Sequence, residues 1–272
     1  MKLPLPAVVL VLALGASACT KDDGTAEPER PTGSTGATSD PSPAPEGPVY
    51  VSLGDSWAEG AHCNGCRTFP QIHAEALEET LGEPVTFVDL AGQAQPFFNT
   101  PGGGGSAGLL EALRKEQWFR EEVAKGDIIL IETGSNDGGE IYEPIMSGTC
   151  GGKDDTACVA PLARTWKREF NAILDEVEDL RDGQPTAIRL VSSANAFIDP
   201  TSSAATLRGF EAFFEALTVT QCDAAEAHDV VCVDVRPVLN GPDFEQPLND
   251  GTQEAMDAVA RLLLQAGVPE LE

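Results

Sequence analysis

Three short motifs carry residues that could attack a carbonyl carbon and stabilise the charge that develops on its oxygen. A Gly-Asp-Ser motif at 54–56 offers the hydroxyl of Ser56 as a nucleophile. Gly92 offers a backbone N–H, and a Gly-Ser-Asn-Asp motif at 134–137 offers the side-chain amide of Asn136, both as donors to an oxyanion. Each motif alone is also typical of a turn or a helix N-cap. Their meaning therefore depends on whether the fold brings them together.

Each motif follows a short run of aliphatic residues, which places it at the end of a predicted strand. Five such runs are nearly continuous in Val, Ile and Leu, as strands buried on both faces require. They predict strands over 49–53, 85–90, 127–131, 187–191 and 230–235, with helices over 69–81, 106–124, 159–180, 206–228 and 252–265. This alternation predicts an α/β domain with a parallel sheet. Ligands bind beyond the carboxyl ends of the strands in such sheets, where all three motifs fall.

The order of the motifs resembles that of the SGNH/GDSL hydrolase family, over nearly the whole chain from Val49 to Gln265. The resemblance implies a three-layer α/β/α sandwich with a five-stranded parallel sheet in flavodoxin-like order. It also implies that Ser56 is the nucleophile, with an oxyanion hole formed by its own N–H, the Gly92 N–H and the Asn136 side chain. The implied reaction is hydrolysis of an ester, or acyl transfer, through an acyl-Ser56 intermediate without a metal ion or cofactor.

The chain departs from the family pattern at the general base. Family members carry an Asp-x-x-His motif before the last helix, whereas here Asp243 fits the carboxylate position and Gln246 stands where histidine is expected. An amide is far too weakly basic to take the serine proton. His62 is one candidate for a substitute base, because it lies in a loop on the functional side of the sheet, and a carboxylate acting through water is another. His73 and His228 are expected on helix surfaces away from the site.

This departure leaves different classes of function open. The domain could be an ester hydrolase with an atypical base, or a non-catalytic envelope lipoprotein whose pocket binds a glycan or an acylated ligand. A redox protein using Cys63 and Cys66 is a third interpretation. Six cysteines remain when Cys19 is set aside, and an even count in an exported chain favours structural disulfides over a metal site. The spacing predicts the pairs Cys63–Cys66, Cys150–Cys158 and Cys222–Cys232.

The first residues predict export to the bacterial cell envelope. Lys2, an apolar run over 7–14 and small residues over 15–18 have the layout of a signal peptide, and the apolar run is too short to span a membrane. Cys19 follows directly, as in the lipobox of bacterial lipoproteins, which predicts a lipid anchor there. We therefore expect a signal peptide over 1–18, a disordered Pro/Thr/Ser/Gly-rich linker over 19–47 and the hydrolase domain over 48–272.

The charge of the chain limits its partners. A formal net charge of -27 argues against nucleic acid and against anionic lipid headgroups as ligands. Contact with the membrane is therefore expected only through the lipid at Cys19. The expected partner is a small ester or an acylated envelope compound, and we expect a monomer.

Overall fold

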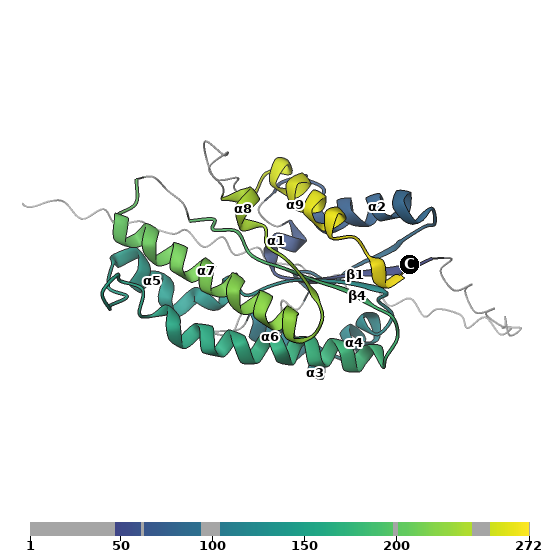
Figure 1. The fold of residues 1–272 in the computed structure, drawn as a ribbon, viewed down its shortest axis with the longest axis horizontal. Coiled ribbons are helices and arrows are strands. Elements are labelled where there is room, and N and C mark those ends of the chain that lie inside the picture. The colour runs from purple at the N-terminus through teal and green to yellow at the C-terminus, as the bar shows by residue number, and fades with distance from the viewer. Residues whose placement is uncertain (1–46, 61–62, 94–103, 198–200, 241–250, 272) are drawn as a thin grey trace, which may run out of the picture. The chain divides into compact units, whose positions relative to one another are not determined.

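The computed structural model describes residues 47–60, 63–93, 104–197, 201–240 and 251–271 (Figure 1). The predicted signal peptide, Cys19 and almost all of the predicted linker lie outside these residues. His62, Asp243 and Gln246 also lie outside them, so their roles stay predictions.

Five parallel strands form one sheet whose centre carries two of the three motifs. The strands are β1 (Val49–Gly54), β2 (Thr86–Asp89), β3 (Ile128–Glu132), β4 (Ala187–Val191) and β5 (Val231–Val233), in the order β2-β1-β3-β4-β5. This is the flavodoxin-like order that the family resemblance implied. The direction of strand succession changes between β1 and β3, and ligand crevices form at such a point. Ser56 follows β1 and Asn136 follows β3.

Helices cover both faces of the sheet, which gives the expected three layers (Figure 1). One face packs against α3 (Gly105–Lys115), α4 (Gln117–Val123), α6 (Val159–Arg181) and α7 (Ala204–Ala227), and the other against α2 (Phe69–Leu81) and α9 (Gln253–Ala266). Side chains alternate between these two cores along each strand: Val51 and Leu53 lie in the first core, and Tyr50 lies in the second. Burial of both faces explains why the strands read as continuous aliphatic runs.

The structure differs from the predicted elements at short helices. The predicted helix over 106–124 is two helices, because Glu116 has an extended backbone. The buried residues reflect this break, since Leu113 and Phe119 are six positions apart, a spacing that one straight helix does not place on a single face. Five further short elements were not predicted: α1 (Ser56–Glu59), η2 (Ser135–Gly138), α5 (Gly139–Ser147), α8 (Arg236–Leu239) and η3 (Pro269–Leu271).

The three predicted disulfide bonds are present. Cys63–Cys66 lies between α1 and α2, Cys150–Cys158 closes the segment before α6, and Cys222–Cys232 joins α7 to β5. Within the described ranges, no helix has both the length and the apolar character needed to cross a membrane.

The prediction that His73 lies on a helix surface is wrong. His73 is fully buried in α2, and its Nδ1 lies 3.0 Å from the hydroxyl of Tyr50. Burial lowers the pKa of His73 to about 3, so the ring is neutral near pH 7. The sequence did contain the signal, because His73 lies four residues from both Phe69 and Leu77 on the buried stripe of the helix.

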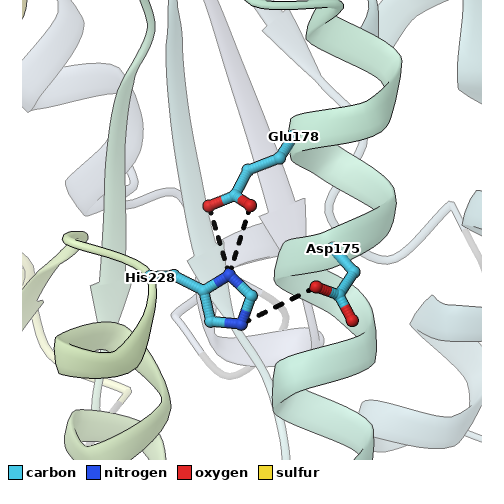
Figure 2. Close-up of side chains that lie close together, drawn as sticks. All are labelled: Asp175, Glu178 and His228. Atoms are coloured by element: carbon cyan, nitrogen blue, oxygen red, sulfur yellow. Dashed lines mark hydrogen bonds and ion pairs between the residues drawn. The ribbon is translucent and has the colours of Figure 1, made fainter.

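His228 lies at the amino end of the sheet, as expected, and its ring lies between two carboxylates of α6 (Figure 2). Its Nδ1 is 3.2 Å from each Glu178 oxygen, and its Nε2 is 3.9 Å from Asp175. These contacts fix the end of α7 to α6. A cavity of about 270 Å³ beside His228 contains none of the three motifs.

Candidate active site

Ser56 is presented at the carboxyl end of β1 by a close contact between strands. Gly54 has a φ of +152°, and a Cβ atom there would lie 2.1 Å from the carbonyl oxygen of Glu132. Only glycine therefore lets β1 approach β3 at this point. Ser56 then begins α1, which the buried side chains of Trp57 and Ala58 hold against the sheet. The N–H of the first residue of a helix points away from the helix, and such a direction suits an oxyanion donor.

Ser56 and Asn136, which follow two neighbouring strands, line the same cavity. The cavity has a volume of about 130 Å³ and opens at the carboxyl ends of β1, β3 and β4. It is lined by Ser56, Trp57, Glu132, Ser135, Asn136, Tyr142, Ser193, Ala194, Ala196, Phe197 and Phe214. The side chain of Asn136 is exposed at this edge, where it could donate to an oxygen of a bound ester.

Gly92 lies beside α1, but its N–H already has a partner. A Cβ atom at Gly92 would lie 2.3 Å from the carboxylate of Glu59, the last residue of α1, so glycine is required for this approach. The Gly92 N–H donates to the carbonyl oxygen of Gly54 at 3.0 Å. Gly92 is not among the described residues that line the cavity. Its role in the oxyanion hole therefore stays a prediction and requires this hydrogen bond to be shared or exchanged.

Glu132 also lines the cavity, although no role for it was predicted from the sequence. It is the last residue of β3, its side chain is fully buried, and its Oε1 accepts a hydrogen bond from Ser193 Oγ at 2.9 Å. Buried carboxylates are rare in proteins, because desolvation penalises the charge. The signal in the sequence was a single acidic residue at the end of an otherwise aliphatic strand, directly before the Thr-Gly-Ser-Asn-Asp segment.

Aromatic side chains form one wall of the cavity. Tyr142 of α5 packs against Phe197 at 5.1 Å between ring centroids, and Phe197 lies 6.2 Å from Phe214. The Tyr142 hydroxyl donates to the carbonyl oxygen of Ser135, which fixes the ring against η2. This wall offers apolar surface to an acyl or aryl group next to the polar Ser56 and Asn136.

Comparisons with known proteins support the fold. No protein-family model and no curated protein matches this chain. A lipase from a goat rumen metagenome has a similar structure, with a TM-score of 0.62, 20% sequence identity and coverage of 83% of this chain and 100% of the lipase. Phospholipase A1 from Streptomyces albidoflavus has a TM-score of 0.54 and 12% sequence identity, with coverage of 80% of this chain and 98% of the phospholipase. A variant of an acetyl-xylooligosaccharide esterase from Geobacillus has a TM-score of 0.54 and 13% sequence identity, with coverage of 81% of this chain and 94% of the esterase. The chain therefore has the fold of the SGNH/GDSL hydrolases.

Proposed function

We propose that the protein hydrolyses a small ester outside the cytoplasm through an acyl-Ser56 intermediate. The observation that carries this proposal is the meeting of Ser56, Asn136 and Glu132 in one cavity. These residues follow or end two neighbouring strands, and they supply a nucleophile, an oxyanion donor and a carboxylate. The extracytoplasmic location rests on the signal peptide and lipobox pattern, and the disulfides agree with it.

The proposed reaction has two steps. Ser56 Oγ attacks the carbonyl carbon while Glu132 takes the hydroxyl proton, directly or through one water molecule. The negative charge that develops on the carbonyl oxygen is stabilised by the Ser56 N–H and the Asn136 amide. The alcohol leaves with the proton, and the acyl group remains on Ser56. Water then attacks the acyl carbon, Glu132 again takes the proton, and the carboxylic acid leaves with Ser56 restored.

Glu132 is proposed as the base because it is the carboxylate among the described cavity residues. The Ser193 hydroxyl donates to one of its oxygens and so fixes the orientation of the group. His62, with Asp243 as a carboxylate that orients a base, is the alternative arrangement predicted from the sequence. The aromatic wall favours a substrate with a short apolar acyl group, and the envelope location favours acylated envelope compounds.

The direct test is turnover of p-nitrophenyl acetate by the protein lacking its signal peptide. We expect saturable release of p-nitrophenol, with an initial burst of about one equivalent if deacylation is the slower step. A second candidate function, non-catalytic binding of a glycan or acylated ligand, is motivated by Gln246 in place of histidine. Absence of turnover with a folded protein, together with calorimetric binding of an acetylated oligosaccharide, would support that candidate instead.

A further inference from the structure

Asp55, the residue before the nucleophile, connects three elements of the site. Its carboxylate accepts hydrogen bonds from Thr133 Oγ1 and from the Gly134 N–H, each at 3.1 Å. A third donor is the N–H of Gly105 at the start of α3. The backbone N–H of Asp55 donates to the carbonyl oxygen of Glu132 at 2.9 Å. This buried residue thus joins the ends of β1 and β3 to α3.

Asp137, the residue after Asn136, binds the same end of α3. It accepts from the Ser106 N–H at 3.2 Å, from Ser106 Oγ at 2.5 Å and from Trp166 Nε1 at 2.8 Å. A Cβ atom at Gly105 would lie 2.0 Å from Asp137 Oδ1, so the carboxyl group packs directly on this glycine. The first two residues of α3 therefore donate their N–H groups to two different carboxyl groups, one beside the nucleophile and one beside the oxyanion donor.

The hydroxyl of Ser106 lies between two carboxyl groups. Its Oγ lies 2.5 Å from Asp137 Oδ2 and 2.5 Å from Glu169 Oε2. A hydroxyl has one proton to donate, so both contacts are full hydrogen bonds when one carboxyl group of the pair also carries a proton. Burial raises the pKa of Asp137 to about 6, and the Glu169 charge acts in the same direction. Burial, followed by the charge of Asp137, raises the pKa of Asp55 to about 7.

The groups that face Asp55 and Asp137 are themselves acidic or neutral. Glu169 faces them from α6, and Tyr142 faces them from α5. Burial and the charges of both aspartates raise the pKa of Tyr142 well above its usual range, so it stays neutral. In the described parts of the chain, no lysine, arginine or histidine forms an ion pair with either aspartate. A proton is therefore what relieves the repulsion between these carboxyl groups.

We propose that Asp55 and Asp137 are positioning residues that hold the Ser56 segment against the Asn136 turn, with Asp137 sharing a proton with Ser106 and Glu169. This inference rests on the proposed function, because positioning has meaning only if Ser56 and Asn136 act together. The acids have raised pKa values in the folded state, so the stabilisation is fully present below about pH 4 and is lost as the pH rises through about 6 to 7. Ester turnover should fall over the same range as the two segments separate.

The test compares wild-type protein with Asp137→Asn, which keeps the size of the side chain and removes its charge. In the wild type, the unfolding equilibrium constant should rise about a thousandfold between pH 5 and pH 8, because the folded-state pKa values of Asp55 (about 7) and Asp137 (about 6) lie about two units and about one unit above pH 5. In Asp137→Asn, the rise of the unfolding equilibrium constant over this pH range should be smaller by a factor of at least about ten. In the same range, kcat/KM for p-nitrophenyl acetate should fall about tenfold in the wild type and by a smaller factor in the variant, in which Asp55 still titrates and Asp137 does not.

Asp154→Asn is the matched control, because Asp154 is an exposed aspartate remote from these contacts, and it should follow the wild-type curves. Circular dichroism in the near ultraviolet establishes that each variant is folded. If Asp137→Asn does not fold, the carboxyl carbon resonances of Asp55 and Asp137 in the wild type give the same information, since both should titrate above pH 5.5. Titration of both near pH 4 would overturn the inference.

The two arms of the test separate this inference from the proposed function. Equal pH dependence of unfolding in the wild type and Asp137→Asn would refute the shared proton. Turnover with identical pH profiles in both proteins would refute the positioning role and leave the proposed function intact. A pH difference in unfolding without any turnover would refute the proposed function, and with it the positioning role, while the shared proton would stand.

Discussion

Replacement of Ser56 by alanine should lower kcat for p-nitrophenyl acetate by a factor of about 10⁴ to 10⁶. The variant loses the atom that forms the acyl bond, whereas Asn136 can still stabilise an oxyanion formed by attack of water. A residual rate above the uncatalysed reaction is therefore expected, within the factor of about 10³ to 10⁴ that such donors and binding can supply. Initial rates under single-turnover conditions measure the difference.

The control for Ser56→Ala is Ser147→Ala, because Ser147 is an exposed serine at the end of α5 and outside the cavity. It should retain the wild-type rate. A Ser56→Ala variant that retains more than about a tenth of wild-type activity would show that another group is the nucleophile.

Replacement of Glu132 by glutamine should lower kcat by a factor of about 10² to 10⁴, the usual contribution of a general base. Glutamine has nearly the same shape and can still accept a hydrogen bond from Ser193, but its amide cannot take a proton from Ser56. Because the base must accept a proton twice, acylation and deacylation should both slow. Rapid-mixing measurements of the p-nitrophenol burst and of the later steady rate separate the two steps.

Glu140→Gln provides the matched control for Glu132→Gln, because Glu140 is an exposed carboxylate near the start of α5. A loss of activity in Glu132→Gln alone would support Glu132 as the base. If Glu132→Gln keeps its rate and His62→Gln loses it, the base is the histidine predicted from the sequence.

The sheet and the position of Ser56 and Asn136 could be predicted because both depend on local patterns. Aliphatic runs identify buried parallel strands, and residues directly after such strands meet at one edge whatever the side-chain packing. Glu132 could not be assigned a role in this way. Glu132 is the last residue of a strand, and the amino-acid sequence alone does not show that its side chain lines the same cavity as Ser56.

The hydrogen bonds around Asp55 and Asp137 could not be predicted from the sequence for a related reason. Their partners are distant in the chain: Thr133 lies 78 positions from Asp55, and Ser106 lies 31 positions from Asp137 and 63 from Glu169. Such contacts follow from the packing of α3 and α6 on the sheet, which no local pattern specifies. The hydrogen bond from the Gly92 N–H to the Gly54 carbonyl oxygen could not be predicted either. A glycine after a strand indicates that another group approaches the backbone closely, but it does not identify the partner of the glycine N–H.

The most direct test of the central claim, that Ser56 is an activated nucleophile, is labelling with a fluorophosphonate followed by peptide mass spectrometry. The proposed mechanism predicts one covalent adduct on the folded wild-type protein, located on Ser56, and none on Ser56→Ala. An adduct on a different residue, or a folded wild-type protein that stays unlabelled under conditions that label a known serine esterase, would contradict it.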